Sequence, residues 1–215
     1  MKKEVIIFGT GGHSKVVYDI IVKEGVYTPV AFVSLNQNLK TFLDLPHYHQ
    51  NEFSKLKFEA GVVAIGDNWV RSKIVETVIS INKNFNFIKA IHPSAQIGTG
   101  CIIGKGTVVM ANTVINPFST VGEHSIINTS SSIDHDCTVG NFASIAPGAT
   151  LGGTVSIGDF STISLGANVI HGRTVGPHTV VGAGSLVIKD IEDHAFAYGL
   201  PCKVIRKRAE DEKYL

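Results

Sequence analysis

The feature that most constrains this 215-residue chain is a strict hydrophobic period of six. From residue 91 to residue 187 every sixth residue is Ile, Val or Leu, and a small side chain usually follows four positions later. An α-helix repeats about every 3.6 residues and a simple strand about every 2, so neither produces this pattern. A period of six is the signature of a parallel β-helix, in which each hexapeptide forms a short strand and a turn. Three hexapeptides, or about eighteen residues, then make one coil.

The N-terminal part of the chain lacks this period. An apolar strand over residues 4–8 leads into a glycine-rich turn and a helical pattern, and further strands follow at residues 29–33 and 61–65. A second helical pattern comes after the third strand. Strands that alternate with helices predict a small parallel sheet. We therefore expect an α/β, Rossmann-like domain over residues 1–90 and a β-helix domain with a C-terminal tail over residues 91–215.

The glycine-rich turn reads GTGGHS at residues 9–14. A dinucleotide fingerprint would place Gly at position 14, where this chain has Ser14, and no acidic residue ends the second strand, so an NAD site is not expected. Backbone amides at the helix start, including those of Gly11 and Gly12, can still hold a phosphate. The alternative is a tight turn that binds nothing. Ligands of such sheets lie beyond the carboxyl ends of the strands, where this turn and the loop at residues 66–68 emerge.

Composition excludes several classes of partner. The net charge of +1 gives no electrostatic basis for binding nucleic acid or an anionic membrane. No apolar run reaches the length of a membrane span. Of the three cysteines, Cys101 and Cys137 occupy the small position of the repeat, which favours packing over catalysis. We expect a cytoplasmic protein without a disulfide framework.

The period also places residues that are distant in sequence beside one another. Residues eighteen apart lie directly above one another, about 4.8 Å apart. His135, Gly153 and His171 therefore share one corner, and Gly153 leaves room for a slender ligand. His135 lies between Asp134 and Asp136, and a neighbouring carboxylate orients an imidazole and raises its basicity. The alternative is a solvated corner histidine with incidental acids.

A metal site at this corner is not expected. Histidines two coils apart with a third five residues further on would resemble a trimeric γ-class carbonic anhydrase. The position five after His171 is Gly176, so the third ligand is missing.

Two other outer features leave alternatives open. Phe142 and Phe160 also lie eighteen apart, flanked by His124 and His178, and this stripe favours a subunit interface over a cofactor site. The basic cluster at residues 206–208 either meets a phosphate-bearing ligand or forms a solvated tail beside acidic residues.

Several motifs together carry a family resemblance. The chain resembles the hexapeptide-repeat acyltransferases, and more narrowly bacterial sugar acyltransferases with a small N-terminal nucleotide-binding domain before a left-handed β-helix. These include the N-acetyltransferases of UDP-linked 4-amino-4,6-dideoxy sugars, as in bacillosamine synthesis, and the sialic acid O-acetyltransferases. The motifs are GTGGHS at residues 9–14, AIGDN at 64–68, NTSSSIDHDC at 128–137, IAPGATLGG at 145–153 and GLPCK at 199–203.

The resemblance implies a homotrimer with acetyl-CoA lying along the β-helix between neighbouring subunits. His135 matches the family's general base, and Asp136 matches the acid that polarises it. Gly153 matches a backbone amide that contacts the thioester carbonyl. Leu165 and Ala183 fall at positions that line the CoA channel.

On the substrate side, the resemblance implies that His13, beside Gly11 and Gly12, lies near the sugar. Asp67 and Asn68 match the loop that helps to hold the nucleotide.

Two departures from the family pattern concern substrate contacts. Several relatives end the second strand with paired aspartates that grip the uracil or ribose, where this chain has Ser34 and Leu35. Many relatives also carry a second histidine nine residues after the general base, where this chain has Ser144.

The expected activity is acetyl transfer from acetyl-CoA to the amine of a UDP-, dTDP- or GDP-linked amino-deoxy sugar, for bacterial surface glycans. The alternatives are a sugar O-acetyltransferase, an acetyltransferase for serine or another small molecule, and a non-catalytic β-helix module for assembly or sensing. A test for acetyl-CoA binding separates the enzymes from the last of these.

Overall fold

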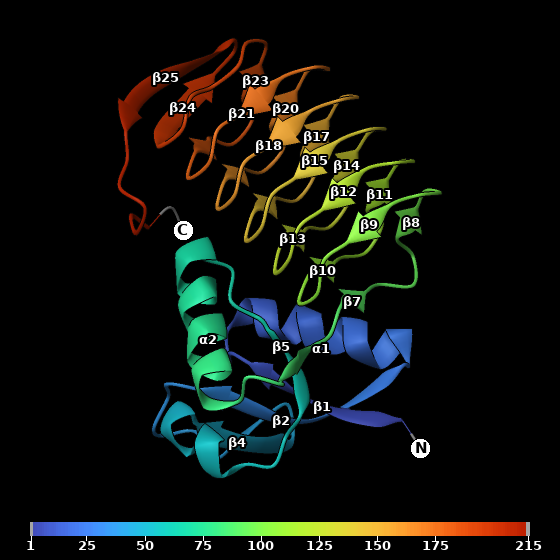
Figure 1. Ribbon diagram of the computed structural model, residues 1–215, viewed down its shortest axis with the longest axis vertical. Coiled ribbons are helices and arrows are strands. Elements are labelled where there is room, and N and C mark those ends of the chain that lie inside the picture. Colours follow the sequence, from blue (N-terminus) through green and yellow to red (C-terminus); the bar gives the residue numbers. More distant parts are fainter. Residues whose placement is uncertain (1, 214–215) are drawn as a thin grey trace.

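The computed structural model describes residues 2–213, with an α/β unit at the N-terminal end and a β-helix stacked beyond it (Figure 1). The sheet of the α/β unit has the strand order β3-β4-β2-β1-β5-β6, and it is parallel except for the β3–β4 pair. Its elements are β1 (Lys3–Phe8), α1 (Gly12–Glu24), β2 (Tyr27–Ser34), β3 (Thr41–Phe42), β4 (Leu45–His49), the 3-10 helix η1 (Gln50–Lys55), β5 (Ala60–Val63), α2 (Asn68–Ile81) and β6 (Asn86–Phe87).

Strand β1 lies at the centre of this sheet and is covered on both faces. Val5, Ile6 and Ile7 are fully buried, as expected for a parallel strand between two helical layers. Helix α1 packs Val17 and its neighbours on one face, while α2 and η1 cover the other. The carboxyl ends of β1, β2 and β5 therefore meet at one edge of the sheet.

The β-helix is built from two-residue strands in three sheets, which form the three faces of a prism. The first sheet, here the domain face, contains β7 (Ala90–Ile91), β10 (Val108–Val109), β13 (Ile126–Ile127), β16 (Ser144–Ile145), β19 (Thr162–Ile163) and β22 (Val180–Val181). The second contains β8 (Gln96–Ile97), β11 (Val114–Ile115), β14 (Ser132–Ile133), β17 (Thr150–Leu151), β20 (Asn168–Val169) and β23 (Leu186–Val187). The third contains β9 (Ile102–Ile103), β12 (Thr120–Val121), β15 (Thr138–Val139), β18 (Ser156–Ile157) and β21 (Thr174–Val175).

A hairpin of β24 (Ala195–Gly199) and β25 (Cys202–Lys207) extends the domain face beyond β22 at the C-terminal end of the β-helix.

The predicted register of eighteen is confirmed. Val109 pairs with Ile91 on one side and with Ile127 on the other. The apolar residues of the repeat form the interior of the β-helix, and Ile127 and Ile145 are fully buried there. The small position has a second role that the period alone does not predict. The Ser125 hydroxyl donates to the Gly140 carbonyl of the next coil at 2.7 Å, so the hydroxyl groups also tie successive coils together.

Each corner of the prism places one residue of every coil in the left-handed backbone region. We name the corners by the residues at their outer surface. The histidine corner carries His135, Gly153 and His171; the junction corner carries His124, Phe142, Phe160 and His178; the groove corner carries Pro147, Leu165 and Ala183.

The N-terminal unit packs against the domain face and the junction corner of its own chain. Ala90, Val108 and Ile126 share one buried cluster with helix α1. The rings of the junction corner stack on one another, with 5.1 Å between the centroids of Phe142 and Phe160. Our expectation of a subunit interface at this stripe is wrong for its first coils, because residues of the N-terminal unit cover them.

Two aromatic side chains of the N-terminal unit pack against the rings of the junction corner. Phe87 meets the edge of His124 at 4.7 Å between centroids, and Trp69 meets Phe160 at 6.1 Å.

Candidate active site

His135 is exposed and oriented by two carboxylates. Its Nδ1 lies 2.8 Å from Asp136 Oδ2, and the Asp134 carboxylate accepts from the His135 backbone N–H at 2.8 Å. Asn116 Nδ2 donates to the same Asp134 carboxylate at 2.9 Å, which holds that turn in place. The hydrogen bond to Asp136, followed by the charge of Asp134, raises the pKa of His135. Because Nδ1 carries the hydrogen in this bond, Nε2 is the nitrogen that can accept a proton.

Gly153 is buried directly beneath the His135 ring. A Cβ at Gly153 would lie 2.7 Å from both Cε1 and Nε2 of His135, so only glycine leaves this ring position open. The predicted alignment of His135, Gly153 and His171 is confirmed, because Leu151 pairs with Ile133 in the coil before and with Val169 in the coil after.

The residues predicted for acetyl-CoA lie on another part of the prism. Leu165 and Ala183 line a groove of 290 Å³ at the groove corner. Leu165 is 58% exposed, so the groove offers an apolar surface to a ligand. Thr162 and Phe196 complete its wall on the domain face. Within one chain the structure brings Leu165 and Ala183 together, but it leaves His135 on a different corner.

A second cavity of 310 Å³ lies at the carboxyl edge of the N-terminal sheet. It is bounded by the glycine turn after β1, the end of β2 and the first turns of α2, and it is mainly apolar. Of the predicted substrate residues, Gly11 lines this cavity, while Gly12 is exposed at the start of α1. The Asp67 carboxylate caps α2 by accepting from the Val70 N–H at 2.9 Å.

His13 lies at the start of α1, next to the domain junction. Its Nε2 is buried and has no hydrogen-bond partner among the described residues. Burial, with the nearby Arg71 charge as a smaller cause, lowers the pKa of His13 to about 4. This imidazole is therefore neutral at pH 7.

Asn68 is placed differently from our expectation. It does not line the cavity at the edge of the N-terminal sheet, and its side chain, only 2% exposed, reaches the β-helix. There its amide hydrogen-bonds Ser144, at 2.7 Å, and Thr162, at 3.0 Å. Ser144, at the position of the second histidine of relatives, is thus engaged in a contact between the N-terminal unit and the β-helix.

Sequence reasoning missed Arg71, which is 1% exposed. Its guanidinium donates to carbonyl oxygens of both the N-terminal unit and the β-helix. A signal was present, because Arg71 shares the buried face of α2 with Val75 and Val78.

A buried histidine, His47, holds the Ser34 side chain at the end of β2. The Ser34 hydroxyl lies 2.9 Å from His47 Nε2, and His47 Nδ1 lies 2.8 Å from the Leu39 carbonyl. Since a carbonyl only accepts, His47 Nδ1 is the donor, and Ser34 donates to Nε2. The end of β2 is therefore held by a serine–histidine hydrogen bond rather than by carboxylates.

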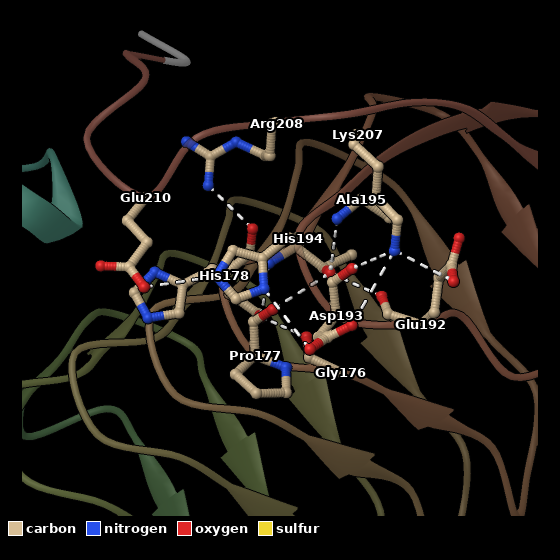
Figure 2. A network of polar contacts seen from close by, with 12 residues as sticks. Gly176, Pro177, His178, Glu192, Asp193, His194, Ala195, Lys207, Arg208 and Glu210 are labelled. Carbon is tan, nitrogen blue, oxygen red and sulfur yellow. Dashed lines mark hydrogen bonds and ion pairs between the residues drawn. The ribbon is translucent and has the colours of Figure 1, made fainter.

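The basic cluster at residues 206–208 is paired within the chain. Arg206 binds Glu212. Lys207 Nζ lies 3.0 Å from Glu192 Oε2, and Arg208 donates to the His178 carbonyl at 2.8 Å (Figure 2). Among the described residues, these contacts leave no cation of the cluster free to favour the phosphate-binding interpretation, and the solvated-tail interpretation does not hold for Arg208, which is only 7% exposed.

The same figure shows three possible metal ligands close together, His178, His194 and Glu210. The two imidazoles stack at 5.0 Å with only 13° between their planes. Lone pairs of parallel rings point in similar directions rather than toward one ion. This cluster is also on a different corner from His135.

A parallel β-helix with an oriented histidine and an N-terminal nucleotide-type domain defines the class of hexapeptide-repeat acyltransferases. Residues 4–78 match the family described as the PglD N-terminal domain. The structure of PerB from Caulobacter crescentus, solved with CoA and GDP-perosamine, is 36% identical over 94% of this chain and 96% of that one, with a TM-score of 0.88. The chain belongs to the sugar N-acetyltransferase family of hexapeptide-repeat proteins with a PglD-type N-terminal domain.

Two further relatives accord with this family. The acetyltransferase domain of PglB from Neisseria gonorrhoeae, solved with acetyl coenzyme A, is 32% identical over 95% of this chain and 100% of that one, with a TM-score of 0.87. The UDP-N-acetylbacillosamine N-acetyltransferase of Bacillus subtilis is 35% identical over 116 residues, which are 51% of this chain and 52% of that protein. Among residues 2–213, no helix is long and apolar enough to cross a membrane.

Proposed function

We propose that this protein transfers the acetyl group of acetyl-CoA to the amine of a nucleotide-linked amino-deoxy sugar. The observation that carries the proposal is the 2.8 Å pairing of His135 Nδ1 with Asp136 Oδ2, which leaves Nε2 as a base at the surface of the β-helix. Support comes from PerB, which was solved with CoA and GDP-perosamine. Two cavities, at the edge of the N-terminal sheet and at the groove corner, are available for the nucleotide sugar and for acetyl-CoA and support the proposal.

The chemistry is a direct acyl transfer. The neutral sugar amine attacks the thioester carbonyl, and His135 Nε2 takes a proton from the nitrogen as the C–N bond forms. Asp136 stabilises the imidazolium that results. We assign the Gly153 backbone N–H to the stabilisation of the oxyanion of the tetrahedral intermediate. This intermediate collapses with cleavage of the C–S bond. The imidazolium then returns its proton to the departing CoA thiolate.

We further propose that the two parts of the chain bind different substrates. Residues 1–90 hold the nucleotide through Gly11, Gly12 and the Asp67 loop, with His13 toward the sugar. Residues 91–215 carry the base and the acetyl-CoA groove at Leu165 and Ala183. A cytoplasmic location accords with the three free cysteines.

A homotrimer is part of the same proposal. Because His135 and the acetyl-CoA groove lie on different corners of one chain, the complete site requires the histidine corner of one subunit against the groove corner of the next. Exposed apolar residues such as Ile102, which is 63% exposed, and Phe118, which is 66% exposed, accord with burial between subunits.

The test is thiol release from acetyl-CoA with UDP-, dTDP- and GDP-linked 3- and 4-amino sugars, each beside its hydroxyl analogue. We expect turnover of one amino sugar, and a roughly 10²–10⁴-fold loss of kcat in His135→Ala. Acetylation of the hydroxyl analogues alone, or full activity of His135→Ala, would overturn the proposal.

A further inference from the structure

Four polar side chains form a buried cluster where the N-terminal unit meets the β-helix. We call Asn68, Arg71, Ser144 and Thr162 the junction cluster. Asn68 is at its centre: its Oδ1 accepts from Arg71 Nη2 at 2.6 Å and from the Ser144 hydroxyl at 2.7 Å. Its Nδ2 donates to the Thr162 hydroxyl at 3.0 Å and to the Phe160 carbonyl at 3.1 Å. The side-chain amide therefore uses its donors and acceptor toward the β-helix and Arg71 at once.

Arg71 extends the cluster to the loop that follows β5. Its Nη1 donates to the carbonyls of Ile65, at 2.8 Å, and Gly66, at 2.9 Å. Its Nε and Nη2 donate to the carbonyls of His124, at 2.7 Å, and Phe142, at 3.0 Å. A single planar guanidinium thus joins one loop to two successive coils of the β-helix, in a geometry that a flexible lysine would not reproduce.

The cluster lies between the two substrate cavities. Ile65 and Val70, on either side of Asn68, line the cavity at the edge of the N-terminal sheet. Thr162, which accepts from Asn68, lines the groove that contains Leu165. The walls of both cavities are therefore connected through one side-chain amide.

We propose that the junction cluster positions the Asp67 loop, which we assign to the nucleotide sugar, relative to the acetyl-CoA groove, with Asn68 and Ser144 as its positioning residues. This inference rests on the proposed acetyl transfer. The amine and the thioester bind to separate parts of the chain, so their separation depends on what fixes these parts together. A misplacement of about 1 Å costs on the order of 10²-fold in rate. Buried and fully bonded polar groups hold one arrangement because any other leaves donors unsatisfied.

Ser144→Ala is the sharpest test, because Ser144 does not line either cavity. We expect kcat to fall by about tenfold or more, with the KM for acetyl-CoA changed by less than about twofold. Ser144→Thr keeps the donor and restores kcat. The equivalent strand position one coil further on carries a threonine, Thr162. Ser156→Ala, at the same strand position on the third face, is the matched control and keeps wild-type kcat.

Asn68→Ala should lower kcat further than Ser144→Ala. The double variant should have the same kcat as Asn68→Ala alone, because both substitutions remove the same hydrogen-bonded pair. If Asn68→Ala does not fold, the Ser144 series decides by itself.

Trp69, the only tryptophan, supplies a readout independent of turnover, because its ring packs on Phe160 at the junction. Ser144→Ala should shift its emission to longer wavelength, and Ser144→Thr should not.

The outcomes separate the two proposals. A wild-type protein that releases no thiol with any sugar overturns the acetyltransferase proposal and this one with it. An active wild-type with an equally active Ser144→Ala overturns the positioning role alone. A Ser144→Ala variant with a lower Tm but wild-type kcat does the same, because it shows a purely structural contact.

Discussion

At the scale of single residues, the proposed chemistry depends on what surrounds one exposed imidazole. Asp136 fixes the tautomer of His135, Asp134 fixes its backbone, and Gly153 leaves space for its ring. Each of these neighbours affects a different property of the base, so each predicts a different change when it is replaced.

Asp136→Asn should lower the pKa of His135, because it removes the largest cause of the upward shift. In the proposed mechanism the active form is the neutral imidazole, so activity should rise with pH through this pKa. The acidic limb of kcat/KM should therefore move to lower pH, and the plateau should fall by about tenfold or more, because the imidazolium loses its counter-charge. A pH–rate profile measures both, with Asp211→Asn on the exposed tail as the control. An unmoved acidic limb would refute this assignment of the carboxylate.

Gly153→Ala should displace the His135 ring while leaving the coil folded. The added Cβ would lie 2.7 Å from two ring atoms, and the exposed imidazole is the part that can move. We expect kcat to fall by on the order of 10²-fold with little change in Tm. Steady-state kinetics and a thermal melt check this, and wild-type kcat would show that the ring does not need this position.

At the scale of elements, the junction corner combines structural stacking with a buried titratable group. His124 stacks on Phe142 at 5.1 Å and is 2% exposed. Burial, with the charges of Arg71 and Lys105 as smaller causes, lowers the pKa of His124 to about 3. The folded state therefore holds this ring neutral, whereas the unfolded chain protonates it below its ordinary pKa of 6.5.

The direction in which pH changes the stability follows from proton binding by the unfolded chain. Between about pH 6.5 and pH 3 the unfolded state binds the extra proton, so stability falls as the pH falls through this window. His124→Phe removes this effect and keeps the stack, since Phe142 and Phe160 occupy the same position in the next coils. We expect the Tm of this variant to be near that of the wild type at pH 7.5 and higher than that of the wild type at pH 5. At pH 5 the free energy of unfolding of the variant should exceed that of the wild type by up to about 2 kcal/mol per chain. Equal differences at both pH values would contradict this account.

The elements also show what the sequence could predict. The period of six fixes which side chains point inward and which stack at each corner, so the core and the alignment of His135 with Gly153 follow from it. It does not predict what covers a face, and for that reason the stripe around Phe142 was assigned to a neighbouring subunit.

Contacts between the N-terminal unit and the β-helix were beyond sequence reasoning for a physical reason. Asn68 and Ser144 are 76 residues apart, and no spacing rule links a non-repeating loop to a repeat. Strand β4 was missed as well, because LPHYH carries no alternating apolar pattern.

At the scale of the whole molecule, the proposed site is divided between corners and therefore between subunits. His135→Ala removes the base, and Ala183→Trp fills the exposed groove position. Each variant alone should be inactive, whereas trimers co-assembled from equal amounts should recover about a quarter of wild-type activity, because an intact histidine corner then meets an intact groove at some interfaces. Thiol release after co-expression measures this. An inactive mixture would show that a single chain contains the entire site.

The pairing of strands eighteen residues apart has a consequence for insertions and deletions. Six residues added between His135 and Leu165 would keep every strand and turn intact, yet would rotate all later side chains onto the next face. Eighteen residues added at the same point would lengthen the prism without rotation, and the groove would only rise by one coil. Homologous chains of different length should therefore differ by whole coils in this region, and shorter changes should fall outside the repeat or at its ends.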